Sequence, residues 1–343
     1  MSDALRAVLE SGVGTAYPGA VMAVGVDDHL ELELAVGGLD VDGPAVTGAT
    51  VYDLASLTKP IAVATPLFAA LSEDRLRLDE RVDADLGLSR AVTLRQLLGH
   101  ASGLPAWFDL RSWLAEAHPG LVAAEVPAVV RAKLRQLPFE RAPGTAAVYS
   151  DPGYLLLGEL LPRRLGRALD DLSATGSPGL TYTPGTAAPT AEPDSPWPPR
   201  RGEVHDPSAR LLGGVAGNAG VFGTAADVVR WAQRLLRAWR GLEPTIDPAV
   251  LRACWCDPPP WNEPTTWRLG FDTPSAHGST AGHHMGPNAV GHLGFTGTSV
   301  WLAPERGLVV VLLSNRTRLG ATAQAPLRAL RPRVHDAVIA LLR

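Results

Sequence analysis

The chain contains 343 residues, of which 46% are hydrophobic and 19% charged, and its formal net charge is −4. This composition is globular and provides for a large core, in one large domain or two modest ones. The slight acidic excess disfavours nucleic acid and anionic membrane surfaces as partners, because both need a basic face.

The N-terminal sequence MSDALRAVLESG lacks the basic stretch and apolar run of a secretory signal. We expect no membrane span, because no run of about 18 apolar residues is visible. Cys254 and Cys256 are too close in sequence for an ordinary disulfide, and C-x-C provides too few ligands for zinc. The sequence therefore predicts a cytoplasmic protein with two inert thiols.

Strands are predicted near both ends of the chain. The four extended segments are 18–26, 30–36, 298–303 and 308–314. Within 30–36, apolar and acidic residues alternate, which is typical of a half-buried strand. The second pair is joined by the turn sequence PERG at 304–307. The unbroken apolar run LVVVLL indicates a buried central strand.

Between these hairpins, the pattern favours helices and loops. Helices are predicted at 61–73, 94–98, 122–136, 153–165 and 225–239, with a closing helix at 323–342. Residues 224–227 (TAAD) come close to a capping box. This order predicts an α/β architecture of the α+β type, with one antiparallel sheet built from both chain ends and an inserted helical region.

We expect a single domain over residues 1–343. Its sheet subdomain is expected at 1–55 and 285–343, and its mainly helical subdomain at 56–284. The segment 177–207 contains eight prolines, for which a disordered linker is one interpretation. We favour an ordered loop over a cleft, because the segment holds Tyr182 and Trp197 and lies inside one domain.

Ser56 and Lys59 form an S-x-x-K pattern between strand-like sequence and an apolar helix. On a helix, residues three apart share a face. A serine hydroxyl needs a base to become nucleophilic, and a lysine serves if burial or a nearby positive group lowers its pKa. The helix start also directs a free N–H at an attacked carbonyl. The alternative is an N-cap serine beside a surface lysine.

Two later segments also contain candidate catalytic residues. Tyr149, in VYSDPGY, is a candidate for moving a proton between nucleophile and leaving group. The alternative is a packed tyrosine, with Asp151 capping the next helix. The segment GHLGFTGT at 291–298 can admit a substrate backbone or supply an oxyanion N–H. The alternative there is a bulged hairpin strand.

Taken in this order, the three segments resemble the serine β-lactamase and penicillin-binding-protein-like superfamily, which uses S-x-x-K, then Y-x-N, then K-T-G or H-x-G. Tyr149-Ser150-Asp151 resembles Y-x-N with Asp in place of Asn, and His292-Leu293-Gly294 resembles H-x-G. The branch it is similar to holds class C β-lactamases, D-Ala-D-Ala carboxypeptidases and related esterases and amidases. Further similar segments, some of them typical of peptidoglycan-related amidases, are 18–21, 94–105, 153–158, 204–207, 213–220 and 333–337.

This resemblance implies a β-lactamase/transpeptidase-like fold with the active site between the sheet and the helical subdomain. It implies that Ser56 is the acylated nucleophile, Lys59 its base and Tyr149 the proton shuttle. The implied oxyanion hole consists of the backbone N–H groups of Ser56 and Phe295.

The substrate-binding strand implied by the resemblance includes His292 and Gly294. His292 stands where penicillin-recognising members have a lysine that helps to bind a substrate carboxylate. Asp151 in place of Asn puts in doubt the amide contact that Asn makes to substrate.

The implied reaction is acyl transfer from an amide or ester to serine and then to water, with no cofactor and no metal. A small molecule or a cell-wall-derived muropeptide is the expected substrate. A small-ester esterase and a catalytically weak binding protein that retains the fold remain alternatives. Neither the leaving group nor the oligomeric state follows from the sequence.

Other patterns point elsewhere less strongly. The chain has no G-x-S-x-G, H-E-x-x-H or P-loop, and no G-x-G-x-x-G after a strand. The histidines at 277, 283 and 284 are a candidate metal site, although a flexible polar loop is the favoured interpretation. The glycine-rich stretch 213–220 is expected to form a tight loop beside the active site rather than a phosphate site. His100 and His205 are expected to be hydrogen-bonded structural residues, with a place in the cleft as the alternative.

Overall fold

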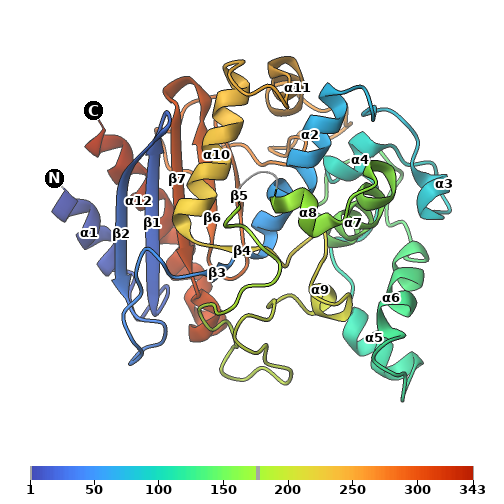
Figure 1. Cartoon of the computed structure of the whole chain (residues 1–343), viewed down its shortest axis with the longest axis horizontal. Coiled ribbons are helices and arrows are strands. Elements are labelled where there is room, and N and C mark those ends of the chain that lie inside the picture. Colours follow the sequence, from blue (N-terminus) through green and yellow to red (C-terminus); the bar gives the residue numbers. More distant parts are fainter. Residues whose placement is uncertain (1, 175–177, 343) are drawn as a thin grey trace.

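The computed structural model describes residues 2–174 and 178–342. An antiparallel five-stranded sheet, in the order β2-β1-β7-β6-β5, lies beside a largely helical half of the molecule (Figure 1). Its strands are β1 (Gly19–Val26), β2 (His29–Gly37), β5 (Val290–Leu293), β6 (Ser299–Ala303) and β7 (Leu308–Ser314). The expected α+β class, with one sheet built from both chain ends, is confirmed.

The strand β7 lies at the centre of the sheet, paired with β1 and β6. All of its residues are buried, as the LVVVLL run predicts. The strand β5 forms an edge and ends at Leu293, because the chain then turns through 294–298 back into β6. The predicted glycine-rich edge strand is therefore half strand and half turn.

Helices cover both faces of the sheet. The helices α1 (Ser2–Glu10) and α12 (Gln324–Leu341) contact each other on one face, and α10 (Ala225–Trp239) packs against β1 and β7 on the other (Figure 1). Alternate side chains of β1 separate accordingly. Met22 belongs to the cluster with α1 and α12, whereas Val21 and Ala23 belong to the cluster with α10.

The helical half contains the segment with Ser56 and Lys59 at its centre. Its remaining helices are α2 (Thr65–Ser72), α3 (Asp83–Leu86), α4 (Leu94–Leu98), α5 (Leu110–Ala117), α6 (Val126–Arg135), α7 (Asp151–Leu165), α8 (Leu169–Ala174), α9 (Pro207–Leu211) and α11 (Pro248–Trp255). The predicted helices at 94–98 and 225–239 have the observed bounds, and Thr224 and Asp227 do form a capping box. Several short helices were not predicted, because one or two turns give too few apolar repeats to show a period.

A second, two-stranded sheet joins β3 (Tyr52–Asp53) to β4 (Phe222–Gly223) and was not predicted from the sequence. It extends inward through a bond from Leu54 N to Val221 O of 2.9 Å. This small sheet delivers the chain to Ser56, so it belongs structurally to the site.

The proline-rich segment is held against the fold from residue 178 onward, while residue 177 lies outside the described residues. The Tyr182 hydroxyl donates to Ala216 O over 2.8 Å. The Arg210 guanidinium lies 3.6 Å from the centre of the Trp197 ring. These contacts tie both aromatic residues of the segment to the body of the protein.

Among the described residues, one helical stretch, Ala55–Ser72, is long and apolar enough to cross a membrane by length and composition alone. It is not an unbroken apolar run, because it includes Lys59, two prolines and four serine or threonine residues. Within the protein, 78% of that stretch is buried. It includes Ser56 and Lys59, and its burial is what places them in the interior.

Candidate active site

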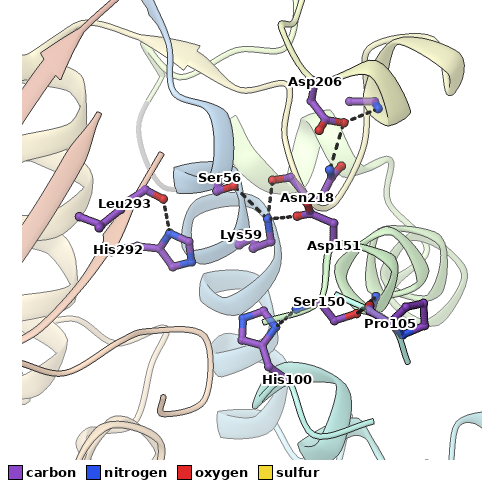
Figure 2. A network of polar contacts seen from close by, with 12 residues as sticks. Ser56, Lys59, His100, Pro105, Ser150, Asp151, Asp206, Asn218, His292 and Leu293 are labelled. Carbon is purple, nitrogen blue, oxygen red and sulfur yellow. Dashed lines mark hydrogen bonds and ion pairs between the residues drawn. The ribbon is translucent and has the colours of Figure 1, made fainter. Parts of the chain in front are cut away.

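Ser56 and Lys59 begin the buried central helical segment. Ser56 lies in the 3₁₀ helix Ala55–Leu57, and Lys59 is the first residue of the π-helical turns Lys59–Ala64. Lys59 Nζ donates to Ser56 Oγ over 3.1 Å (Figure 2). Lys59 is fully buried, whereas Ser56 is partly exposed. The hydroxyl is therefore the member of the pair that a ligand can reach.

The residue before Ser56 has a strained backbone. Ala55 has a φ of 48°, in the left-handed region that a residue with a Cβ disfavours. Asp53 supports this turn, because its two carboxylate oxygens accept from Ala55 N at 2.8 Å and from His205 N at 2.6 Å. Burial raises the pKa of Asp53 to about 6, although both backbone N–H groups act to lower it. Strain held in this way is typical of a functional turn.

Lys59 is surrounded by acceptors. Besides Ser56, its ammonium donates to Asp151 Oδ1 at 2.7 Å and to Asn218 O at 3.1 Å (Figure 2). These partners use all three N–H groups of an ammonium. Burial by itself lowers the pKa of Lys59, but the charge of Asp151 and the Tyr149 phenol outweigh it, and the pKa is raised. The lysine is therefore a cation at rest, unlike the neutral base that the sequence pattern suggests.

Asp151 pairs with Lys59 because it is not needed as a helix cap. Ser150 is the N-cap of α7, and its hydroxyl accepts from Gly153 N at 3.2 Å. The alternative interpretation of Asp151 as the cap was wrong. Its carboxylate is committed to Lys59 instead.

Tyr149 lies against both members of the pair. Its hydroxyl is in hydrogen-bonding reach of Ser56 and Lys59, and Lys59 Nζ lies 4.8 Å from the ring centre. Burial raises the pKa of Tyr149, and Lys59 only partly opposes this, so the phenol is neutral at pH 7. The ring packs on His100 and Trp267, with centroids 4.6 and 5.1 Å away.

His292 lies on β5, facing this aromatic cluster, with its ring centroid 5.9 Å from that of Tyr149. Its Nδ1 is 2.9 Å from Leu293 O, and a carbonyl partner requires the proton to be on Nδ1. Nε2 is then an acceptor, and it is buried without a partner among the described residues. Burial and the charge of Lys59 lower the pKa of His292 to about 3. The imidazole is neutral throughout the physiological range.

The turn that follows β5 is joined to the chain just before Ser56. The hydroxyls of Thr296 and Thr298 donate to Asp53 O at 2.8 Å and to Leu54 O at 3.0 Å. Gly294 allows this approach, because a Cβ there would lie 2.7 Å from Leu54 O. Phe295 occupies the tip of the turn with its side chain 55% exposed. The structure thus brings the two expected oxyanion donors, on Ser56 and Phe295, onto adjacent segments.

Asp206 and Asn218 extend the polar network, and the sequence analysis gave them no role. Asn218 Nδ2 donates to Asp206 Oδ1 at 3.1 Å, while the backbone carbonyl of Asn218 accepts a hydrogen bond from Lys59 Nζ (Figure 2). Burial and the nearby Asp151 raise the pKa of Asp206. Both residues lie in segments, 204–207 and 213–220, that resemble the family in sequence. Their spacing from Ser56 offers no signal that they would meet it.

The histidine-rich stretch does not form a metal centre in the part of the chain that the structure describes, where no group of three or more ligating side chains gathers. His283 instead lies 2.7 Å from Asp336 Oδ2 through its Nδ1. Cys254 and Cys256 are both free thiols.

Comparisons with known proteins agree with this geometry. Residues 5–332 match the family model described as Beta-lactamase. The N-acetylmuramyl-L-alanine amidase of Bacillus subtilis (strain 168) is 27% identical, over 90% of this chain and 79% of its own. A protein of Escherichia coli O157:H7, provisionally described as a D-alanyl-D-alanine carboxypeptidase, is 26% identical, over 89% of this chain and 80% of its own.

Solved structures share the architecture. EstCE1, described as a hydrolase with promiscuous acyltransferase activity, superposes with a TM-score of 0.75 at 18% identity, covering 97% of this chain and 98% of its own. The octameric penicillin-binding protein homologue from Pyrococcus abyssi superposes with a TM-score of 0.73 at 18% identity, covering 99% of this chain and 77% of its own. At these identities the likeness establishes the fold alone.

Proposed function

The chain belongs to the Beta-lactamase family of serine hydrolases, and from this membership we propose that it cleaves an amide or an ester through an acyl-enzyme on Ser56. Its β-lactamase/transpeptidase-like fold agrees with the sequence expectation. The observation that carries the nucleophile assignment is the 3.1 Å contact between the partly exposed Ser56 Oγ and the buried Lys59 Nζ. A reachable hydroxyl held against proton-transfer groups is the arrangement that covalent catalysis needs.

In the proposed acylation step, Lys59 must first release one proton to solvent, because an ammonium that donates to three acceptors has no lone pair with which to act as a base. The neutral amine then takes the Ser56 proton as Oγ attacks the carbonyl carbon. The N–H groups of Ser56 and Phe295 stabilise the resulting oxyanion. Tyr149 gives its phenolic proton to the leaving nitrogen or oxygen and regains one from Lys59, so the protons balance.

Deacylation reverses these roles. Water takes the place of the leaving group and passes a proton to Tyr149 as it attacks the acyl carbon, while Tyr149 passes its own phenolic proton to the neutral Lys59. Lys59 then returns a proton to Ser56 Oγ as the acyl group leaves. Each step uses side chains within one contact of the hydroxyl. His292 stays neutral, and its Nε2 acceptor is buried without a partner among the described residues.

For the substrate, we propose an amide of a cell-wall-derived muropeptide. Support comes from the relatives, since both the amidase and the carboxypeptidase assignments concern peptidoglycan peptides and both alignments cover most of each chain. A small-ester esterase remains the second candidate, with a hydrolase of the same fold as its only support.

The test is active-site labelling followed by a substrate panel. A fluorophosphonate probe should label the wild-type protein and leave the Ser56→Ala variant unlabelled, and mass spectrometry should locate the adduct on Ser56. Equal labelling of both proteins would refute the nucleophile assignment. Turnover of a muramyl-L-alanine amide above that of D-Ala-D-Ala peptides and para-nitrophenyl acetate would support the proposed substrate, and the reverse order would contradict it.

A further inference from the structure

In the turn after β5, residues 294–298, every backbone carbonyl accepts a hydrogen bond. The bonds run from Gly297 N to Gly294 O (3.1 Å), from Arg316 Nε and Nη2 to Phe295 O (3.0 and 2.8 Å), from Arg316 N to Thr296 O (2.8 Å), from Ser314 Oγ to Gly297 O (3.0 Å), and from Arg331 Nη2 to Thr298 O (2.8 Å). A short turn with all of its acceptors occupied has little freedom to rotate its peptide groups.

Arg316 supplies the strongest of these restraints. It directs two guanidinium nitrogens at the single carbonyl of Phe295, and the third, Nη1, donates to Gly320 O at 3.3 Å. The guanidinium also lies 4.7 Å from the centre of the Phe295 ring, so it contacts both the backbone and the side chain of that residue.

The charge of Arg316 is unusual for its position. The residue is 3% exposed, and no carboxylate lies within ion-pair distance of it among the described residues. Burying a cation without a counter-ion is costly, and backbone carbonyls compensate only in part. Burial accordingly lowers the pKa of this guanidinium, with only the more distant Glu192 acting against it. A buried unpaired cation beside a reaction centre therefore calls for a role beyond stability.

Direct binding of a substrate carboxylate does not fit Arg316. Its three guanidinium nitrogens are all engaged with carbonyl oxygens, and its exposure is too small to admit an anion. Arg316 instead contacts Phe295, whose backbone N–H is the second expected oxyanion donor.

We propose that Arg316 is a positioning residue for the oxyanion hole. By clamping Phe295 O it holds the Phe295 backbone at the tip of the turn, beside Ser56, and its buried charge adds a positive potential behind the oxyanion. Preorganised donors and fixed charge act most strongly in a low-dielectric site. The inference rests on the proposed function for its catalytic consequence, but the clamp itself is a statement about the turn.

Arg331 supports the same arrangement from α12. It is buried and donates to Thr298 O, at the other end of the turn. Burial and the neighbouring Arg316 lower the pKa of Arg331 to about 10. Two cations thus converge on one turn despite their mutual repulsion, which favours a requirement for positive potential at this place.

The test compares Arg316→Met and Arg316→Lys with Arg318→Met as the matched control. Arg318 is two residues away but pairs with Asp40 outside the turn. Arg316→Met should lower kcat about 10²-fold, near the lower end of the cost of losing one oxyanion donor, with KM nearly unchanged. It should weaken a boronic acid transition-state analogue by a similar factor. For Arg316→Lys, kcat and the affinity for the boronic acid should lie between those of the wild type and Arg316→Met. Arg318→Met should have wild-type values of both.

Hydrogen exchange of the amides at 294–298 gives a second measurement that needs no catalysis. Exchange there should speed up in Arg316→Met and stay unchanged in Arg318→Met. A folded Arg316→Met with wild-type exchange and wild-type kcat would overturn the proposal. If that variant does not fold, a folded Arg316→Lys with wild-type values would overturn it equally. Failure of the wild type to be labelled on Ser56 would instead refute the proposed function, while the exchange result would still decide the clamp.

Discussion

At the scale of single residues, the charge state of Lys59 is the central feature of the site. The S-x-x-K pattern predicts the pair, and the 3.1 Å contact is in place. The pattern alone does not reveal that Asp151, in the position that the family fills with Asn, lies 2.7 Å from the lysine. One carboxylate thus converts an expected neutral base into one half of a buried ion pair. The consequence is a dependence on pH.

Replacing Asp151 by Asn should move the acidic limb of the pH profile of kcat/KM to lower pH. Asp151 is the main influence that raises the pKa of Lys59, while burial lowers it. Without the carboxylate, the neutral amine therefore exists at lower pH, and the profile follows the free enzyme. Hydrolysis of a reporter ester from pH 5 to 10 measures the limb.

Asp79→Asn is the matched control, because Asp79 forms an exposed pair with Arg95. Its profile should coincide with that of the wild type. If the limb of Asp151→Asn stayed in place or moved to higher pH, the carboxylate would not be what holds the proton on Lys59.

Penicillins should be poor substrates because of His292. A β-lactamase has to recognise the carboxylate of the drug, and neutral His292 offers it no proton, because its one N–H is bonded to Leu293 O and its Nε2 is an acceptor. The pKa of His292 is lowered to about 3, so the ring stays neutral even at pH 5. We expect kcat/KM for nitrocefin at least about 10³-fold below the roughly 10⁸ M⁻¹s⁻¹ of the fastest enzymes. Efficient hydrolysis, or a sharp gain between pH 7 and pH 5, would contradict this account.

At the scale of elements, the glycine-rich turn after β5 explains how distant segments form one site. The sequence predicts the strands of both hairpins, and the runs of apolar residues are sufficient for that. It does not predict that Thr296 and Thr298 bond to the chain just before Ser56, because such bonds depend on tertiary approach. For the same reason, the contacts of Asn218 with Lys59 and of Arg316 with Phe295 become visible only in the folded chain.

Gly294→Ala should separate this turn from Ser56. A Cβ at that position would clash with Thr298 Oγ1 and would lie 2.7 Å from Leu54 O, a backbone atom, so the turn would have to shift. We expect a loss of about 1–3 kcal/mol in the free energy of unfolding, as overpacked sites show, and a larger proportional loss of acylation rate. Urea unfolding and single-turnover acylation measure the two quantities.

Gly185→Ala is the control for this substitution. A Cβ there has no neighbour within 4 Å. It should leave stability and acylation near wild-type values. Wild-type acylation in Gly294→Ala would show that the close approach of the turn is not needed.

At the scale of the whole molecule, the two halves of the fold were predictable to different degrees. The long, strongly patterned elements β1, β7 and α10 lie where the sequence places them, because burial on one or both faces dictates their residues. The helical half was predicted less completely, since its short helices are set by local caps and by packing on their neighbours. Its ionisable groups likewise become buried only when the halves close on one another.

Buried histidines should make the whole protein labile to acid. Burial lowers the pKa of His205 and of His335 to about 4, that of His292 to about 3, and that of His100 well below its usual value. Between pH 6.5 and about 4, these histidines therefore bind more protons in the unfolded chain than in the folded chain. The free energy of unfolding consequently falls as the pH falls. Asp53, Asp206 and Asp272 act in the opposite sense, because burial raises the pKa of each carboxyl and protonation then favours the folded state. The four histidines outnumber them.

His335→Asn isolates one of these contributions away from the active site. His335 Nδ1 is 2.9 Å from Thr280 O, and an asparagine amide can donate that bond without titrating. Each such histidine is worth about 1.4 kcal/mol per pH unit in the window, so the variant should lose about 2 kcal/mol less than the wild type between pH 6.5 and pH 5. Urea unfolding at the two pH values measures the difference. An identical loss in both proteins would mean that His335 is protonated in the folded state, and that acid lability originates elsewhere.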